Sequence, residues 1–323
     1  MTMLRSCAML LTHICLVGQV ACAAWAQNYP VKPVRYIIPS TGGTEVIGRL
    51  IAQGLTQTLG QQVFVDPRTG AAGNLGAEIA ARAPADGYTL FQVTQSHTVN
   101  ASLFRNLSYE LIRDFAAVTR TDSSPMIVVV HPSFPAKSIR DLVKLARARP
   151  GAINYSSAGV GTSTYLAAEL FKLTADVNLV EIPYRSGAPS LTAVIAGEVP
   201  VYFGPIATVL PHVREGRLRA LAVSTASRLP TLPRLPTVAE SGYPGYEAGN
   251  WHGLMVPART PRQIIVTIRE ATVAVLNQPD VHRRLSDLGY TAIGDQPEEF
   301  TAFLKSDIAK WRNLIRQKGI TAD

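Results

Sequence analysis

Cysteine is scarce in this 323-residue chain and lies only near its start, at Cys7, Cys15 and Cys22. The same stretch has the features of a secretory signal peptide, because Arg5 precedes a largely apolar run that ends in Ala24-Trp25-Ala26. Cleavage after Ala26 would leave a mature chain without cysteine, which excludes disulfides, thiolate catalysis and cysteine-ligated metals. The alternative is processing to a lipid-bearing N-terminus at Cys22.

Long apolar runs and basic runs are also lacking. The apolar part of the leader is short, and no later stretch is long and apolar enough to span a bilayer. We therefore expect an exported, periplasmic protein rather than one with a transmembrane anchor. The absence of a long Lys/Arg run argues against nucleic acid as a partner. The formal net charge is nevertheless +8, and loss of Arg5 with the leader would leave +7, a balance that attracts anionic ligands.

The motifs of several enzyme classes are absent or incomplete. A hydrolase elbow would read Gly-x-Ser-x-Gly, but Tyr165 stands where Ser163 would need the second glycine. Gly159-Val160-Gly161 begins a dinucleotide fingerprint whose third glycine is replaced by Thr164, and no phosphate loop occurs. The histidines show no metal-ligand spacing. We expect binding without chemistry and with no cofactor; the alternative is an exported α/β enzyme that uses His97, on a loop after a strand, or Glu45.

The stretch from residue 37 to 59 is the first informative one. Two isoleucines lead through Pro39 and the small residues Ser40, Thr41, Gly42 and Gly43 into a periodic stripe made by Ile47, Leu50, Ile51, Leu55 and Leu59. This pattern predicts a strand, a glycine turn and a helix N-terminus. The first amides of a helix lack internal partners and carry partial positive charge, so the turn is a candidate cradle for an anion.

The same pattern returns about 115 residues later, by the numbering. A strand at 153–156 runs into Ser157-Ala158-Gly159-Val160-Gly161-Thr162-Ser163 and then into a helix with Leu166, Leu170 and Leu173 on one face. With 47% hydrophobic residues, the chain can form two α/β lobes. Ligands of such sheets bind outside the carboxyl ends of the strands. Two half-sites on two lobes predict a clamp that closes around its ligand.

Strands and helices alternate along the rest of the chain, which predicts parallel sheets covered by helices. We expect a polar loop at 94–97, an irregular connection at 228–250, and helices that start after Ser138, after Thr260-Pro261 and at Pro297. The expected strands are 35–38, 62–65, 88–93, 114–118, 126–130, 153–156, 180–184, 199–203, 218–224 and, short and extended, 254–256.

Several segments together resemble one family across the whole mature chain. They are YPVKPVRYIIP (29–39), GAAGNLGAEIAARAPADGYTLF (70–91), ARPGAINYSSAGVGTSTYLAAELF (148–171), VEIPYRSGAPSLTAVIAGEV (180–199), GRLRALAVST (216–225), RLPTLPRLPTVAESGYPGYE (228–247) and QPEEF (296–300). The chain resembles the Bug family, the extracytoplasmic solute receptors of tripartite tricarboxylate transporters. The resemblance implies an α/β, two-lobe periplasmic-binding-protein fold of the Venus-flytrap, type II-like kind, without catalytic activity.

The resemblance also implies a carboxylate ligand, held largely by backbone amides of the two βα loops. We expect lobe 1 at 28–125 plus 236–323 and lobe 2 at 126–235. The partners would be a small carboxylate and membrane transporter subunits, or a membrane kinase if the role is sensory, and the receptor would be a monomer. The expected ligand-binding residues are Ser40, Thr41, Gly42, Gly43, Thr44, Ser96, His97, Ser157, Gly159, Gly161, Thr162, Ser163, Arg185, Gly204 and Pro205.

This chain departs from the family pattern in the first loop. Glu45 stands where the family has Asp, and the loop is about two residues shorter. Tyr165 replaces a frequent His, and Pro205 stands where Asn or Asp is common. The fold is expected to survive these changes, whereas the identity of the ligand is not carried over.

Overall fold

The computed structural model describes residues 29–41, 43–229 and 231–321. The predicted leader, its cleavage site after Ala26 and the alternative Cys22 lie outside the described residues, as does Gly42. No helix in the described ranges is long and apolar enough to cross a membrane.

The elements follow the predicted alternation of strands and helices. The strands are β1 (Val34–Ile38), β2 (Val63–Pro67), β3 (Thr89–Thr94), β4 (Phe115–Val130), β5 (Ile153–Ser157), β6 (Leu179–Pro183), β7 (Val201–Pro205), β8 (Arg219–Val223), β9 (Gly249–Pro257) and β10 (Thr291–Ala292). The helices are α2 (Gly43–Leu59), the short 3-10 turn η1 (Ala71–Gly73), α3 (Asn74–Ala81), α4 (Gln95–Leu103), α5 (Ile139–Ala148), α6 (Ser163–Ala175), α7 (Gly187–Ile195), α8 (Ile206–Arg214), α9 (Arg262–Leu276), α10 (Pro279–Asp287) and α11 (Pro297–Lys318).

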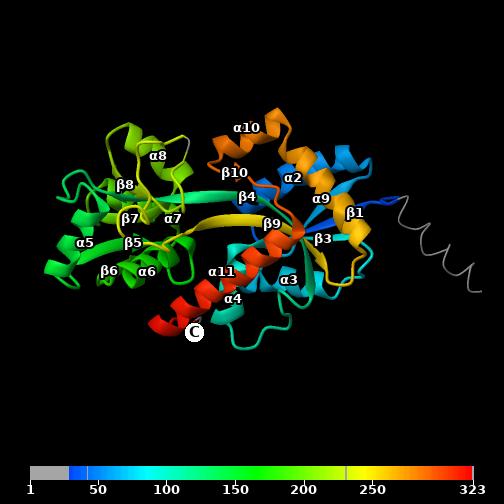
Figure 1. Ribbon diagram of the computed structural model, residues 1–323, viewed down its shortest axis with the longest axis horizontal. Coiled ribbons are helices and arrows are strands. Elements are labelled where there is room, and N and C mark those ends of the chain that lie inside the picture. The colour runs from blue at the N-terminus through cyan, green and yellow to red at the C-terminus, as the bar shows by residue number, and fades with distance from the viewer. Residues whose placement is uncertain (1–28, 42, 230, 322–323) are drawn as a thin grey trace, which may run out of the picture.

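The strands form two groups that β4 connects, in the order β2-β1-β3-β9-β4-β7-β5-β6. Up to Pro125, β4 pairs with β9; from Met126 it pairs with β7, and from Ile127 also with β8. We call the part built on β1, β2, β3, β9 and the start of β4 the first lobe. The second lobe is built on the end of β4 with β5, β6, β7 and β8. Figure 1 shows β4 and β9 running lengthwise through the middle of the molecule.

Two predictions about the strands were wrong. Residues 114–118 and 126–130 were expected as two strands, but residues 115–130 form one 16-residue strand, β4. The polar stretch between them stays extended because β9 pairs with it along its length. The sheets are also mixed rather than parallel: β1 and β5 have parallel neighbours, whereas β4 and β9 run antiparallel to theirs. The division into lobes at residues 125–126 and 235–236 stays a prediction.

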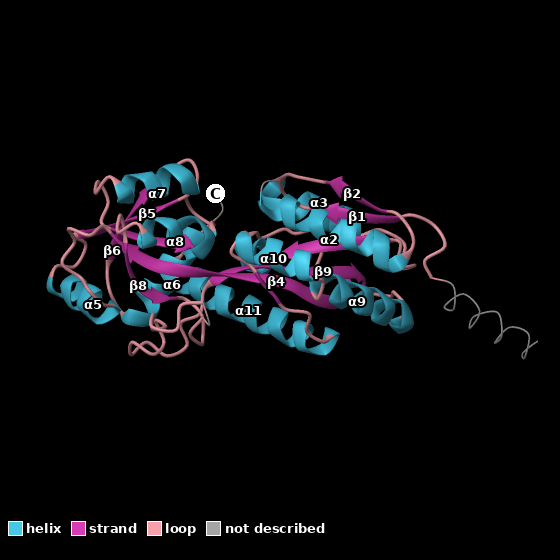
Figure 2. Cartoon of the chain, turned by 90° about the horizontal axis from the view of Figure 1, so that it is seen from above, coloured by secondary structure: helices cyan, strands magenta, loops and turns pink. Residues whose placement is uncertain are grey.

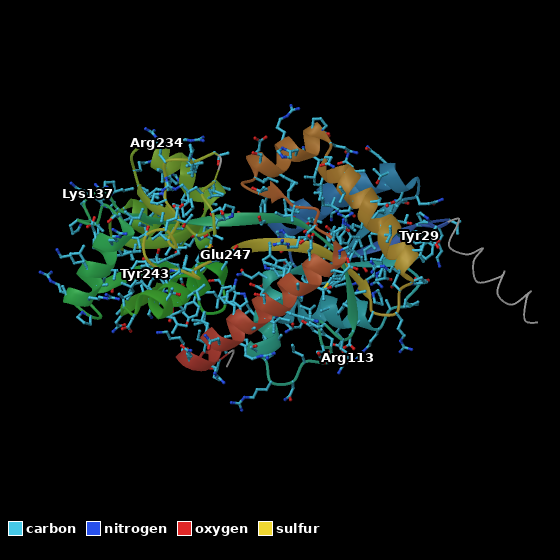
Figure 3. The ribbon with its side chains drawn as sticks, in the orientation of Figure 1. Tyr29, Arg113, Lys137, Arg234, Tyr243 and Glu247 are labelled. Atoms are coloured by element: carbon cyan, nitrogen blue, oxygen red, sulfur yellow. The ribbon has the colours of Figure 1, made fainter. Side chains whose placement is uncertain are left out.

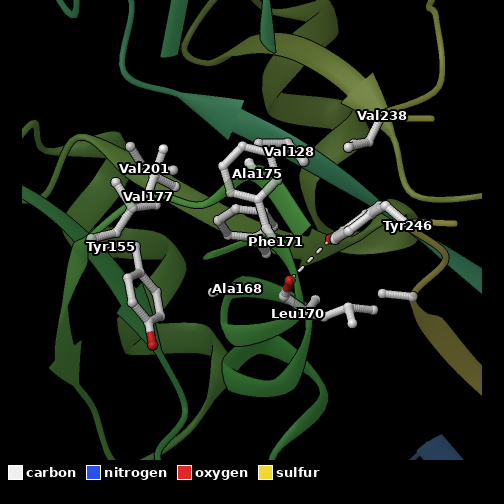
Figure 4. Packing of buried hydrophobic residues seen from close by; sticks show 14 of the residues in the cluster. Val128, Tyr155, Ala168, Leu170, Phe171, Ala175, Val177, Val201, Val238 and Tyr246 are labelled. Atoms are coloured by element: carbon white, nitrogen blue, oxygen red, sulfur yellow. Dashed lines mark hydrogen bonds between the residues drawn. The ribbon is translucent and has the colours of Figure 1, made fainter. Parts of the chain in front are cut away.

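Apolar stripes hold the helices on the sheet. The stripe predicted for α2 buries Ile47, Leu50, Ile51 and Leu55. In the second lobe, Phe171 of α6 packs against Tyr246 and lies in one apolar cluster with Val128, as Figure 4 shows. Burial of such side chains contributes roughly 1.5–3 kcal/mol each, which makes these stripes the main stabilising feature of the two lobes.

Helix α11 begins at Pro297 and ends at Gly319, whose left-handed backbone forms the C-cap. Its first half buries Phe300 and Leu304 in a cluster of the first lobe. Its second half places Trp311 and Leu314 in the main cluster of the second lobe. Figure 2 shows the helix lying along both lobes. The lobes are therefore joined by β4, β9 and α11.

Candidate ligand-binding site

A cavity of about 570 Å³ lies between the two lobes. Its lining comes mainly from the start of α2, one face of α4, the loop before α6 with the start of that helix, and the beginning of β9. The lining residues are Ser40, Thr44, Ala72, Thr94, Gln95, Ser96, Val99, Asn100, Leu103, Phe104, Val160, Gly161, Thr162, Ser163, Leu166, Asn250, Trp251, His252 and Thr321.

Three helix N-termini open onto this cavity. Thr44 is the second residue of α2, Gln95 and Ser96 are the first residues of α4, and Ser163 is the first residue of α6. Helices α2 and α4 belong to the first lobe, and α6 to the second. Each N-terminus offers unpaired amides and partial positive charge. Together they make the cavity favourable for an anion.

The loop before α6 is held in shape by its own hydrogen bonds. The amides of Ala158 and Gly159 donate to Thr164 Oγ1 and Ser157 Oγ, at 3.0 and 2.9 Å. The Thr162 hydroxyl donates to the carbonyl of Gly159 at 2.6 Å. Gly159 and Gly161 have φ angles of 98° and 80°, a region that favours glycine. Within the described part of the chain, the amides of Gly161 and Ser163 have no acceptor, so they remain for a ligand.

The cavity wall is polar on one side and apolar on the other. Thr44 contacts His252, with the Thr44 hydroxyl 3.2 Å from Nε2. In contrast, Val99 and Leu103 of α4 pack with Leu166 of α6 in one apolar cluster across the two lobes. A ligand in this cavity can therefore place a charged group at the helix termini and an apolar body against α4 and α6.

Charged side chains do not line the cavity in the described part of the chain: the lining includes no Asp, Glu, Lys or Arg. Figure 3 shows that the labelled cations Arg113, Lys137 and Arg234 lie on the outer surface. Any anion in the cavity must therefore be held by amides, hydroxyls and the His252 ring. No group of three His, Cys, Asp or Glu side chains among the described residues is placed to hold a metal ion.

Comparison with known proteins identifies the family. A family model described as the tripartite tricarboxylate transporter family receptor matches residues 47–320. This chain belongs to that family. Protein BugT of Bordetella pertussis is 31% identical over 323 residues, which cover 99% of each chain.

The names of two solved structures of similar proteins include a bound carboxylate. R. palustris Rpa4515 with adipate is 33% identical, with a TM-score of 0.74 over 91% of this chain and 99% of that one. MatC from Rhodopseudomonas palustris with bound malate is 29% identical, with a TM-score of 0.71 over 89% and 100% of the two chains. The periplasmic binding protein BugD is 30% identical, with a TM-score of 0.72 over 91% of this chain and 99% of that one, and it confirms the two-lobe periplasmic-binding-protein fold predicted from the resemblance.

Membership of the tripartite tricarboxylate transporter receptor family makes this chain a solute-binding receptor and not an enzyme. The alternative of an exported enzyme using His97 or Glu45 is therefore wrong. Glu45 forms an ordinary helix ion pair with Arg49, at 2.6 Å. His97 is fully buried and does not line the cavity.

The receptor brings only some of the predicted ligand-binding residues to the cavity. Ser40, Thr44, Ser96, Gly161, Thr162 and Ser163 line it. Thr41 and Gly43 are exposed beside it, and Gly42 lies outside the described residues. Ser157 and Gly159 do not line it; they form a hydrogen bond with each other within the loop before α6. Arg185, Gly204 and Pro205 do not line the cavity; Arg185 is exposed, while Gly204 and Pro205 pair with β4.

His97 holds the start of α4 instead of facing a ligand. Residues 94–97 were expected as a loop, but α4 begins at Gln95, and His97 is its third residue. The amide of Thr94 donates to His97 Nδ1 at 3.0 Å, and Nε2 lies 3.3 Å from the carbonyl of Gly73. A neutral ring with its hydrogen on Nε2 satisfies both contacts. His97 thus replaces the usual Glu or Gln of a capping box.

The receptor is expected to lose stability as the pH falls from about 6.5 to about 4, because of His97. Burial lowers the pKa of His97 to about 4, so the unfolded chain takes up a proton in this range before the folded one does. The difference corresponds to about 3 kcal/mol. Urea unfolding at neutral and acidic pH should show a smaller acid loss for His97→Gln, in which Gln keeps the capping box. An equal loss in both proteins would contradict this assignment.

Sequence reasoning missed Asn100, Asn250, Trp251 and His252. The last three lie near the start of β9, which begins at Gly249. The prediction was an irregular connection up to residue 250 and a short strand only at 254–256. Their one available signal was the short apolar run Leu254–Val256 that follows them, which is typical of a buried strand. Trp251 Nε1 lies 3.3 Å from Asp307 of α11, so this part of the wall is anchored to a distant helix.

Proposed function

We propose that this protein is a periplasmic receptor that captures a small carboxylate by closure of its two lobes and delivers it to a tripartite tricarboxylate-type membrane transporter. The observation that carries the proposal is the meeting of three helix N-termini, from both lobes, on one cavity whose described lining has no acidic side chain. The family and the adipate and malate in the names of two similar structures support the carboxylate.

The amides and hydroxyls around the cavity can supply the affinity such a receptor needs. Hydrogen bonds to a charged group contribute roughly 1.5–3 kcal/mol each. A handful of them can offset the costs of desolvation and closure and leave about −8 kcal/mol, which is micromolar binding. Donors on both lobes favour the closed form when the ligand is present, since only closure completes the set.

Two contacts between the lobes support closure. A Cβ built on Gly161 would lie 3.7 Å from Leu103 Cδ2 of the first lobe. A Cβ built on Gly289, which follows α10 in the first lobe, would lie 2.4 Å from the Cβ of Ala207 in α8. Figure 2 shows α8 and α10 next to each other. We assign the lobes to residues 28–125 plus 236–323 and 126–235, as predicted from the sequence.

Carboxylates are expected to raise the melting temperature of the receptor, and the test is a panel of malate, adipate, citrate and benzoate. Binding at about 100 times Kd adds about 2.7 kcal/mol of stability. For a chain of this size that raises Tm by several degrees. Neutral amides and amines of the same carbon skeletons are the controls. A shift with an amide or an amine, and none with any acid, would overturn carboxylate capture.

The export and delivery steps need separate tests. The mass of the mature chain distinguishes cleavage after Ala26 from lipid attachment at Cys22. Capture of membrane proteins on the ligand-loaded receptor identifies the partner: transporter subunits support delivery, and a membrane kinase would replace delivery with sensing.

A further inference from the structure

His252 is the one titratable side chain in the described lining of the cavity. It lies in β9, opposite Thr94 of β3 on one side and Asp122 of β4 on the other. Its side chain is almost fully buried, so its ring nitrogens have fixed neighbours. These neighbours connect the cavity to a buried carboxylate.

Asp122 is fully buried, and its carboxylate contacts the ring of His252. The pairing of β4 with β9 is irregular between Arg120 and Asp122, and this bulge sets Asp122 opposite His252. His252 Nδ1 lies 2.7 Å from Asp122 Oδ1, and Thr121 donates to Oδ2 at 2.6 Å. In the described part of the chain no Lys or Arg lies within 4.0 Å of this carboxylate. Nδ1 therefore carries a hydrogen and donates it to Asp122.

The protonation state of His252 Nε2 determines whether the Thr44 hydroxyl can donate its hydrogen to a ligand. Nε2 lies 3.2 Å from Thr44 Oγ1. In the neutral ring Nε2 has no hydrogen, so it accepts the hydrogen of the Thr44 hydroxyl, which then points away from a ligand. In the imidazolium, Nε2–H donates to Thr44 Oγ1, and the hydroxyl hydrogen is released to donate into the cavity.

We propose that the receptor binds its carboxylate together with one proton, which His252 takes up at Nε2 so that Thr44 can donate its hydroxyl hydrogen to the ligand. One proton leaves a solvent or buffer acid and forms the Nε2–H bond of the ring, and the imidazolium then lies between two anions, Asp122 and the ligand. Asp122 is the positioning residue, because it fixes Nδ1 as a donor and balances the charge. This inference rests on the proposed function and adds the means by which a cavity without Lys or Arg in its described lining neutralises an anion.

The other titratable groups around His252 do not compete for this proton. The ring of Tyr290 packs against the ring of His252, with centroids 5.5 Å apart. Burial, and then the negative charge of Asp122, raise the pKa of Tyr290 to about 12. Burial also raises the pKa of Tyr36 well above its usual value. On α2 the nearest acid, Glu45, is paired with Arg49. On β4, Arg120 is paired with Asp295, and Gln92 and Thr94 of β3 do not titrate.

The test is calorimetric titration of the full mature receptor with malate and with adipate between about pH 6.5 and pH 8.5, where both acids are ionised. Each titration is repeated in two buffers with different heats of ionisation, which gives the number of protons taken up. We expect uptake that approaches one proton at the alkaline end, and an affinity that falls up to tenfold for each unit of rising pH there.

Matched variants test the role of the His252 ring and the role of the Thr44 hydroxyl separately. His252→Gln should bind more weakly with an affinity that no longer depends on pH, and Thr44→Ser should keep the proton uptake that Thr44→Val loses. Asp122→Asn should lower the proton uptake. If that variant does not fold, the variants at His252 and Thr44 still test the proposal. Binding by the wild-type receptor without proton uptake would overturn this inference and leave the proposed function intact. Absence of binding by either acid at every pH, together with no shift by any acid of the panel, would overturn both.

Discussion

Replacing Gly289 with alanine is expected to weaken ligand binding by about tenfold or more, although Gly289 does not line the cavity. A Cβ at this position would lie 2.4 Å from Ala207 Cβ and 2.9 Å from Ala207 N, on the opposite lobe. Atoms do not approach that closely, so α8 and the end of α10 must move apart. Overpacking of this kind costs about 1–3 kcal/mol. In the closure mechanism that we propose, the cost falls on the closed form, and each 1.4 kcal/mol is about a tenfold loss of affinity.

The control for Gly289→Ala is Gly216→Ala. Both glycines have left-handed backbone, with φ of 75° and 72°, so both variants carry the same backbone strain. A Cβ on Gly216 has no heavy atom within 4 Å. The two variants should therefore unfold at similar urea concentrations, and only Gly289→Ala should lose affinity for the acids that shift Tm. Equal affinities in the two variants would show that this contact does not limit closure.

The parts of the site that follow a local pattern were predictable from the sequence. A strand, a turn of small residues and a helix N-terminus are encoded within about fifteen residues, as at Ser40–Thr44 and Ser157–Ser163. The rule that ligands bind beyond strand ends then brings the two loops to one cleft. Six of the fifteen expected residues line the cavity. The other expected residues do not line it in the described part of the chain, because the rule about strand ends predicts where a loop lies and not where each of its side chains points.

The part of the cavity lining that β9 contributes was not predictable, because it depends on pairing between distant strands. His252 meets Asp122 across 130 positions of sequence. Nothing in the residues near His252 signals that partner, and the prolines and glycines at 228–250 hid the start of β9. The polar residues from Thr119 to Ser124 likewise resembled a loop, although pairing with β9 keeps them in a strand. Tertiary pairing overrides local preference in both strands that link the lobes.

The role of His97 could not be predicted from the sequence, for a different reason. Thr94 and His97 have the spacing of a capping box, but the box normally has Glu or Gln at its last position. A histidine after a strand favours the interpretation of a ligand-facing loop. The carbonyl of Gly73, which accepts from the ring, completes the capping role and is 24 positions away.

Asp307→Ala is expected to lower the free energy of unfolding by about 3 kcal/mol. Asp307 of α11 is 3% exposed and accepts from Thr98 Oγ1 at 2.7 Å and from Trp251 Nε1 at 3.3 Å. Lys310 Nζ lies 2.7 Å from its other oxygen. Removal of the carboxylate leaves the indole N–H of Trp251 without a buried acceptor and the partly buried Lys310 ammonium without its partner, at about 1–3 kcal/mol for a neutral group and more for a charged one. The Thr98 hydroxyl keeps the carbonyl of Gln95 as an acceptor, at 2.7 Å. The loss should be measured by urea unfolding at neutral pH.

Glu298→Ala, on the same helix, is the control for Asp307→Ala. Glu298 pairs with Arg262 at 2.6 Å, but its side chain is 62% exposed, and exposed pairs contribute only about 0–1 kcal/mol. A loss for Asp307→Ala no larger than that of Glu298→Ala would contradict the anchoring role. Because Trp251 lines the cavity and α11 packs in both lobes, the Asp307 carboxylate connects the cavity wall to a helix that spans the two lobes. Ligand binding should therefore restore less stability to Asp307→Ala than to Glu298→Ala at the same acid concentration.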